Sequence, residues 1–243
     1  VTGVQTCALP ISMAQESVGL VEAVSTYKTI TVDGNVEDWA GIEAACTDAT
    51  GDGGAYYDFA AAYVANDKDN IYIRLSFSEP QPYGNYFWYM NIAFDTDWDT
   101  STGHGWSVNF GSEFCLQGRQ IFDQRCGDWV CTIDPQSADN NWGTFAYASV
   151  EPISEENCKD IEISISRDLV YKNMDDGQPG LSNPDESPLF DPAYDNFVIL
   201  FETEDENYQS AEWMPNPDPA TNDGGVLYFF AAPPAELPAW EMY

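Results

Sequence analysis

The sequence is poor in positive charge. It has 8 lysines and arginines against 41 aspartates and glutamates, which gives a formal net charge of -33. Phosphate backbones and anionic lipid headgroups repel such a chain, so neither nucleic acid nor a membrane surface is an expected partner. No apolar run reaches the roughly 18 residues of a membrane-spanning helix, so membrane insertion is not expected either. The acidic excess fits an adaptation for solubility or salt, and it also fits carboxylates that hold divalent cations.

The signatures of common catalytic centres are also missing. The chain has one histidine, His104, no Gly-x-Ser-x-Gly segment and no phosphate-binding glycine loop, which argues against serine hydrolases and nucleotide-dependent enzymes. A glycosidase needs only two carboxylates, but no pair stands out. An acid within a strand, such as Glu162, is more often on a solvated face. We therefore expect no catalytic residues.

The beginning of the chain does not read as part of a fold. Residues 1–11, VTGVQTCALPI, resemble the conceptual translation of a sequencing adapter, as in a metagenomic assembly. Ser12, Met13 and Ala14 fit the small-x-Ala pattern that precedes a signal-peptidase cut. We expect residues 1–14 to be an artefact joined to a signal-peptide remnant, and the protein to be secreted or displayed at the cell surface.

Cysteines are few. Cys126 and Cys131 are too isolated for a zinc site, and in an exported protein a disulfide is the better interpretation. The other cysteines outside residues 1–11 offer one further pair and one leftover thiol, with the connectivity left open: Cys46, Cys115 and Cys158.

Apolar residues recur with a period of two, and turn-rich stretches separate the apolar segments. Alternation predicts strands with one face in a core, and more continuous apolar runs predict strands covered on both faces. The alternating segments are residues 71–77, 88–94 and 161–165, the continuous ones are 197–201 and 226–230, and a short early strand is expected at 29–32. No long amphipathic helix is evident. We predict an all-β, antiparallel β-sandwich of jelly-roll or immunoglobulin-like type.

The expected organisation is a single domain with long loops. An extended N-terminal arm, the sandwich and a C-terminal tail follow the artefact, at residues 15–28, 29–232 and 233–243.

Four segments carry recognisable motifs. Residues 30–39 hold an Asp-Gly turn and an Asp-Trp pair, residues 64–75 read VANDKDNIYIRL, residues 92–103 read IAFDTDWDTSTG, and residues 160–165 read DIEISI. In this order and spacing they resemble family 9 carbohydrate-binding modules and the related DOMON domains. The resemblance implies a jelly-roll-like sandwich, a structural calcium site and sugar binding on aromatic side chains. After residue 165 the resemblance is loose.

Acidic side chains alternate in the loop after the strand predicted at residues 88–94. Asp95, Asp97 and Asp99 would bring their oxygens to one point, as calcium requires, and without a cation they would repel one another. An ordinary solvated acidic turn is the alternative. Asp67 and Asp69 in the preceding hairpin are further candidate ligands. Calcium is thus the expected cofactor, in a structural role.

Sugar recognition needs flat apolar faces for the C–H side of a pyranose. Trp39, after the Asp33–Gly34 turn, is expected to be a core residue. Other aromatic side chains fall in loops, where they could bind sugar or merely cover loop cores. The candidate ligand-binding residues are Trp98, Trp106, Trp129, Trp142, Trp213 and Tyr83.

These features favour a non-catalytic extracellular carbohydrate-binding module with structural calcium, which binds a polysaccharide or oligosaccharide. The first alternative is a calcium-dependent cell-surface or extracellular-assembly protein that self-assembles, with residues 15–27 adding a strand to a neighbour. The second alternative is a polysaccharide-active enzyme.

Overall fold

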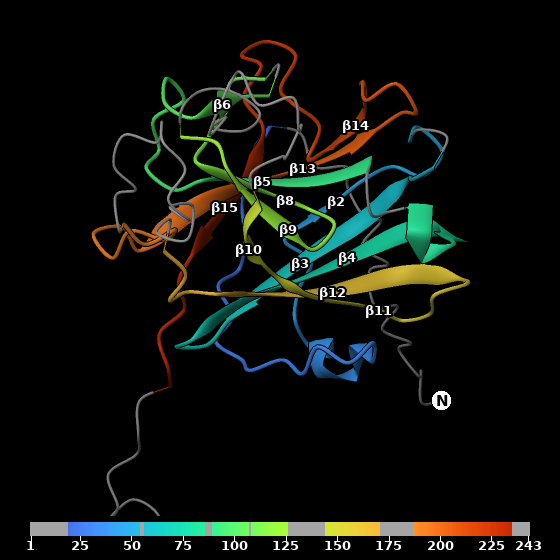
Figure 1. Cartoon of the computed structure of the whole chain (residues 1–243), viewed down its shortest axis with the longest axis horizontal. Coiled ribbons are helices and arrows are strands. Elements are labelled where there is room, and N and C mark those ends of the chain that lie inside the picture. Colours follow the sequence, from blue (N-terminus) through green and yellow to red (C-terminus); the bar gives the residue numbers. More distant parts are fainter. Residues whose placement is uncertain are drawn as a thin grey trace, which may run out of the picture.

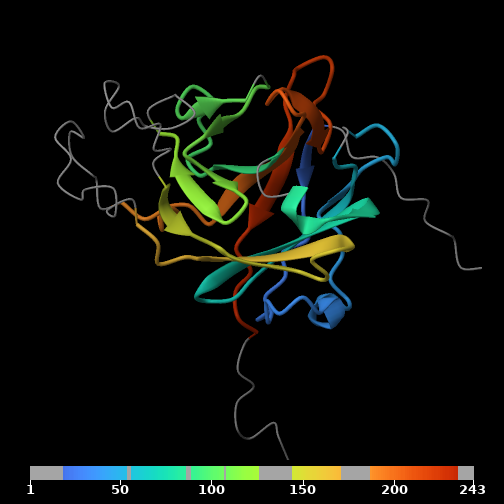
Figure 2. The ribbon, with the colours of Figure 1, turned by 45° about the vertical axis from the view of Figure 1, so that its right-hand side comes forward.

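Two β-sheets packed face to face form the molecule. The structure is a computed structural model, and it describes residues 19–53, 56–85, 89–106, 108–125, 144–170 and 187–234. Figure 1 shows the chain with its strands labelled, and Figure 2 shows β4 and β12 of one sheet beneath β13 and β15 of the other. The predicted β-sandwich is confirmed. No helix among the described residues is long and apolar enough to cross a membrane.

The larger sheet has eight strands in the order β1-β15-β13-β5-β8-β9-β10, with β14 paired to β13 beyond this path. All its described pairings are antiparallel except that of β1 with β15. Its strands are β1 (Leu20–Glu22), β5 (Met90–Asp95), β8 (Phe114–Gln117), β9 (Gln120–Asp123), β10 (Thr144–Tyr147), β13 (Asn196–Glu204), β14 (Ser210–Met214) and β15 (Gly225–Phe229).

The smaller sheet has five antiparallel strands in the order β11-β12-β4-β3-β2. Its strands are β2 (Cys46–Thr47), β3 (Phe59–Asn66), β4 (Asn70–Gln81), β11 (Ser149–Pro152) and β12 (Cys158–Ser166). A short pair, β6 (His104–Gly105) with β7 (Gly111–Ser112), and two 3-10 turns, η1 (Val36–Trp39) and η2 (Tyr83–Asn85), complete the described elements.

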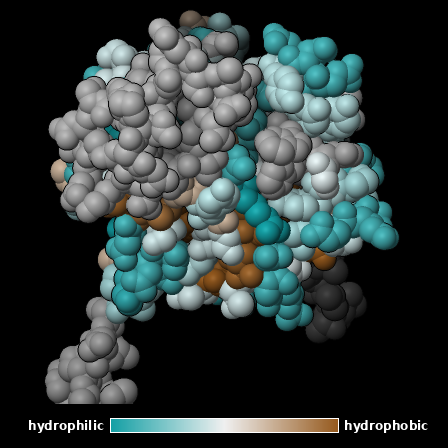
Figure 3. All heavy atoms as spheres, in the orientation of Figure 1, coloured by the Kyte–Doolittle hydropathy of each residue, from teal (hydrophilic) through white to brown (hydrophobic). Residues whose placement is uncertain are grey.

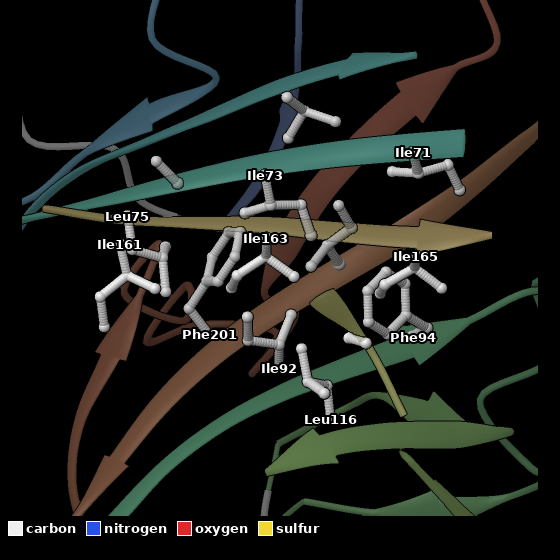
Figure 4. Close-up of a cluster of buried hydrophobic side chains, with 14 of the residues drawn as sticks. Ile71, Ile73, Leu75, Ile92, Phe94, Leu116, Ile161, Ile163, Ile165 and Phe201 are labelled. Carbon is white, nitrogen blue, oxygen red and sulfur yellow. The ribbon is translucent and has the colours of Figure 1, made fainter. Parts of the chain in front are cut away.

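The main core lies between the two sheets. The predicted alternation at residues 71–77 and 161–165 is confirmed, because the apolar side chains of β4 and β12 point together toward the larger sheet (Figure 4). They meet side chains from β5, β8 and β13. The labelled members of this core are each 0% exposed: Ile71, Ile73, Leu75, Ile92, Phe94, Leu116, Ile161, Ile163, Ile165 and Phe201.

The outer face of the larger sheet is covered as well. The loop between β5 and β8 lays Trp106 and Phe110 over Leu200 and Val198, so β13 is buried on both faces, as its continuous apolar run predicts. The same cover corrects the expectation for residues 88–94. Every residue of β5 is buried, including Asn91 and Ala93, which the alternation placed on an open face.

The chain near the N-terminus differs from its prediction in two ways. Residues 29–32 do not form a strand, because the N–H of Thr31 donates to the Asp38 carboxylate at 2.9 Å and no ladder forms there. The arm segment Leu20–Glu22 pairs in parallel with β15 of its own chain, so these residues already have a strand partner.

Trp39 is buried in a small cluster with Ile30 and Tyr72 on the outer face of the smaller sheet, as predicted. Its Nε1 donates to Glu162 at 2.8 Å, and the N–H groups of Asp33 and Gly34 donate to the same carboxylate at 3.2 and 2.7 Å. Glu162 is 0% exposed, so the expectation of a solvated face was wrong. This carboxylate fastens the Asp-Gly turn to β12.

Glu162→Ala is expected to lower the free energy of unfolding by about 3 kcal/mol, because three N–H donors lose a charged acceptor. Glu151, the half-buried residue opposite Glu162 on β11, gives the control variant Glu151→Ala. Urea unfolding measures both. Equal losses in the two variants would contradict the role given to Glu162.

The described cysteines form no disulfide. Cys46, Cys115 and Cys158 are buried on three different strands and are not joined to one another, so the expected further pair among them is wrong. Cys126 and Cys131 lie outside the described residues.

Candidate functional site

The loop from β5 to β8, which we call the acidic loop (residues 95–113), gathers three carboxyl groups. Oxygens of Asp95, Asp97 and Glu113 lie within 4.8 Å of one another. Asp95 ends β5, and Glu113 directly precedes β8, which is paired with β5. The strand register therefore brings the two ends of the loop together.

Hydrogen bonds within the loop fix these carboxylates. Asp95 Oδ1 accepts the Trp98 N–H at 2.7 Å, and Glu113 Oε2 accepts the Thr96 N–H at 2.8 Å. The Thr102 hydroxyl lies 3.1 Å from Asp97 Oδ2 and 3.2 Å from Glu113 Oε1. Several hard oxygen donors thus face one point, an arrangement that suits calcium.

Glycine makes the close approach possible. Gly103 has φ +62°, and a Cβ there would collide with the Ser112 carbonyl group. This position is the glycine of the segment 92–103, and it allows the loop to pass against the residues before β8.

The electrostatics of the acidic loop favour a bound proton or cation. Burial raises the pKa of Asp95 to about 6 and the pKa of Glu113 to about 8, and the neighbouring Asp97 charge adds to both shifts. A divalent ion would relieve this repulsion and the cost of burial together.

The other predicted metal ligands do not join this cluster. Asp99 is exposed, and its carboxylate accepts the Ser101 N–H at 3.0 Å. Asp69 forms an exposed ion pair with Lys68 at 2.8 Å.

Asp67 stabilises the turn of the β3–β4 hairpin. Its carboxylate accepts four hydrogen bonds, from Asp69 N–H and Asn70 N–H at 2.8 Å, from Tyr72 Oη at 2.7 Å and from Thr29 Oγ1 at 2.9 Å. Burial would raise the pKa of Asp67, but these bonds outweigh it and lower the pKa. The carboxylate acts as a structural acceptor in the turn.

Two of the predicted ligand-binding aromatics are core residues. Trp106 is 4% exposed, and its Nε1 donates to Ser112 Oγ at 2.8 Å. Tyr83 is 7% exposed and belongs to the core between the sheets. The structure corrects both assignments, because the elements packed over these rings leave no open face for a sugar.

Among the predicted ligand-binding aromatics that the structure describes, Trp98 and Trp213 keep part of their ring surface exposed. Trp98 is 44% exposed at the tip of the acidic loop, with φ 63°. Trp213 is half-buried on β14, and its ring lies edge-on to Trp106 at 6.5 Å between centroids. Trp129 and Trp142 lie outside the described residues.

A second acidic group joins the two sheets. Asp48, Asp52 and Glu212 bring oxygens within 4.8 Å, and both Glu212 oxygens accept the Phe59 N–H, at 3.1 and 3.3 Å. Burial and the hydrogen bond with Asp48 raise the pKa of Glu212 to about 10. The hydrogen bonds of Glu212 tie β14 to β3 of the smaller sheet.

A further set of polar residues, which we call the Glu202 patch, was not foreseen from the sequence. It comprises Asn91, Glu202, Glu204 and Ser210. Asn91 lies opposite Glu202 across β5 and β13, and Ser210 lies opposite Glu204 across β13 and β14. Glu202 and Asn91 alternate with core residues, so they belong to the outer face of the larger sheet.

The Glu202 patch is rich in hydrogen-bond acceptors. Asn91 Nδ2 donates to Glu202 Oε2 at 2.8 Å, and the Ser210 hydroxyl donates to Glu202 Oε1. Asn91 Oδ1 and Glu204 Oε2 are buried and have no hydrogen-bond donor within the part of the chain that the structure describes. Burial raises the pKa of Glu202 and of Glu204 to about 7, despite their hydrogen-bonding neighbours.

Tyrosine rings border this patch. Tyr89, directly before β5, stacks on Tyr56 at 4.9 Å with an interplanar angle of 6°, and lies 5.6 Å from Tyr208. Tyr208 is 61% exposed at the β13–β14 turn. Burial raises the pKa of Tyr89, and the neighbouring Tyr208 and Tyr56 and the charges of Glu206 and Glu204 add to the shift.

Hydrophilic side chains cover much of the described surface in the view of Figure 3, with hydrophobic atoms confined to smaller areas among them.

No protein-family model and no curated protein sequence matches the chain. Among solved structures, a family 9 carbohydrate-binding module from Caldicellulosiruptor kristjanssonii in complex with cellotriose has 12% sequence identity and a TM-score of 0.43, and covers 91% of this chain and 98% of its own. A family 9 module from the same organism in complex with glucose has 10% identity and a TM-score of 0.42, with 90% and 98% covered. The cellotriose and the glucose are ligands of those two modules.

Proposed function

We propose that the protein is a non-catalytic extracellular carbohydrate-binding module. In this proposal a neutral saccharide binds at the Glu202 patch, and a structural calcium ion binds in the acidic loop.

One observation carries the proposal for the patch. Two buried acceptors without donors, Asn91 Oδ1 and Glu204 Oε2, lie beside the tyrosine border that ends in exposed Tyr208. A buried acceptor without a donor costs about 1–3 kcal/mol. Asn91 and Glu204 are 0% and 8% exposed, so sugar hydroxyls would reach these acceptors only when the β13–β14 turn that carries Tyr208 moves outward. The C–H face of the sugar ring would pack on the exposed tyrosine ring.

The acidic loop lies on the same face of the larger sheet as the Glu202 patch. β5 carries Asn91 and ends at Asp95, and the same loop lays Trp106 against Trp213. An ion held by Asp95, Asp97 and Glu113 would therefore order the side chains beside the patch. Extracellular modules use calcium sites with Kd values of roughly 10⁻⁴–10⁻³ M, and calorimetry would show whether this loop falls in that range.

Tyr208→Ala is expected to weaken saccharide binding about tenfold, because an exposed aromatic platform contributes on the order of 1 kcal/mol beyond its burial. Affinity electrophoresis in gels that contain soluble polysaccharides measures the retardation. Tyr147→Ala is the matched control, since Tyr147 is 69% exposed on β10. Equal retardation of wild type and Tyr208→Ala would contradict this binding face.

A further inference from the structure

A pocket apart from the acidic loop, the second acidic group and the Glu202 patch lies where the β3–β4 turn, the end of β12 and the segments around Asp191 and Phe230 meet. Its volume is about 360 Å³, at the lower end of the range for small-molecule sites. Its polar and aromatic lining includes Lys68, Arg167, Asp168, Asp191, Tyr194 and Phe230. We propose that this Arg167 pocket is a second saccharide site, which binds one neutral sugar unit, and this inference rests on the proposed function.

Arg167 is held in place without an acidic partner. Its Nη1 donates to the Asp67 carbonyl oxygen at 3.1 Å, and its guanidinium carbon lies 4.0 Å from the centre of the Phe230 ring. No ion pair joins it to any carboxylate of the described residues, although the chain has 41 acidic residues. A guanidinium has five N–H donors, so Arg167 can donate to a ligand from a fixed position.

The charges of the lining oppose an ionic ligand. The two cations, Lys68 and Arg167, are balanced by Asp168 and Asp191, and Lys68 is also paired with Asp69 at 2.8 Å. An anion would in addition approach a chain of formal charge -33, which disfavours it at long range. A neutral molecule with many hydroxyl groups can use the cationic donors and the carboxylate acceptors at once.

The remaining lining suits the apolar side of a sugar ring. Tyr194 is 42% exposed, and its N–H donates to the Asp191 carbonyl oxygen at 3.0 Å, which holds the turn. Pro188 and Pro192 border the same space. Flat rings and proline carbons offer C–H contacts, and the charged groups around them offer hydrogen bonds.

The test is a two-dimensional amide NMR titration of the full chain, in calcium, with neutral methyl glycosides (gluco, galacto, manno and xylo forms) and with methyl glucuronoside as the anionic counterpart. A neutral glycoside is expected to shift two separate sets of amides, one around Glu202 and one around Tyr194. Tyr194→Ala should weaken the second set at least tenfold and leave the first unchanged. Tyr208→Ala, at the rim of the Glu202 patch, should do the reverse.

The outcomes separate the two proposals. Shifts around Glu202 alone, or second-set shifts that survive Tyr194→Ala, would overturn the Arg167 pocket and leave the proposed function standing. A stronger response of the Tyr194 amides to the glucuronoside than to any neutral glycoside would overturn the ligand class. No shift in either set would overturn both proposals.

Discussion

Calcium at about one hundred times its Kd is expected to raise the melting temperature by roughly 5–10 °C. Binding to the folded state alone then adds about 2.7 kcal/mol of stability, and a chain of this size gains roughly 2–4 °C per kcal/mol. The physical reason is that Asp95, Asp97 and Glu113 are held within 4.8 Å and lose their mutual repulsion when a cation binds. Calorimetric melting in EDTA and in calcium chloride measures the difference.

Glu113→Gln is expected to remove most of this calcium-dependent shift, because the amide keeps the size of the side chain but not its charge. Asp99→Asn is the matched control and should keep the full shift, since Asp99 is turned toward Ser101. The comparison uses the shift and not the absolute melting temperature, because removal of a buried charge can itself stabilise the calcium-free chain. A wild type that is indifferent to calcium, or equal shifts in both variants, would refute the metal site.

In EDTA, stability is expected to fall as the pH rises from about 5 to about 8. Burial raises the pKa of Glu202 and Glu204 from 4.5 to about 7, and burial with the Asp48 contact raises that of Glu212 to about 10. The folded chain therefore keeps protons that the unfolded chain releases above about pH 4.5. This contribution is complete below the unfolded pKa and is lost as the pH passes the folded pKa.

The shift of Glu202 alone corresponds to about 3 kcal/mol, at about 1.4 kcal/mol per pKa unit. Urea unfolding at several pH values measures how the free energy of unfolding falls as the pH rises. Glu202→Gln should reduce the total loss by about this amount. Glu206→Gln, an exposed change in the same hairpin, should leave the total loss as it is. A stability that rises between pH 5 and 8 would show that the carboxyl groups are ionised in the folded chain.

Several of the long strands could be predicted because their own residues carry the evidence. Alternation at residues 71–77 and 161–165 reflects one buried face. The segment 29–32 has a similar local pattern, yet the Asp38 carboxylate competes for its backbone N–H and no strand forms. Likewise, nothing local shows that Ala93 is buried, because it packs with Trp106 and Phe110 of the β5–β8 loop, or that Asn91 is buried, because its partner is Glu202 on β13.

The sites depended on tertiary register, which local sequence does not contain. The acidic loop could be found from Asp95 and Asp97, but Glu113 takes the place expected for Asp99 because β8 pairs with β5. The strand pairing joins Asn91 to Glu202, which are 111 residues apart. Trp98 and Trp106 lie in the same loop, and Trp106 is buried because it packs in a cluster with residues of β5, β13 and β15.

A glycan array with labelled wild-type protein and Glu202→Gln, both in calcium, tests the carbohydrate site most directly. We expect the wild type to bind a set of neutral oligosaccharides and the variant to lose that set, because one acceptor of the patch becomes an amide. A folded wild type that binds no glycan, or a variant with an unchanged set, would contradict carbohydrate recognition at the Glu202 patch.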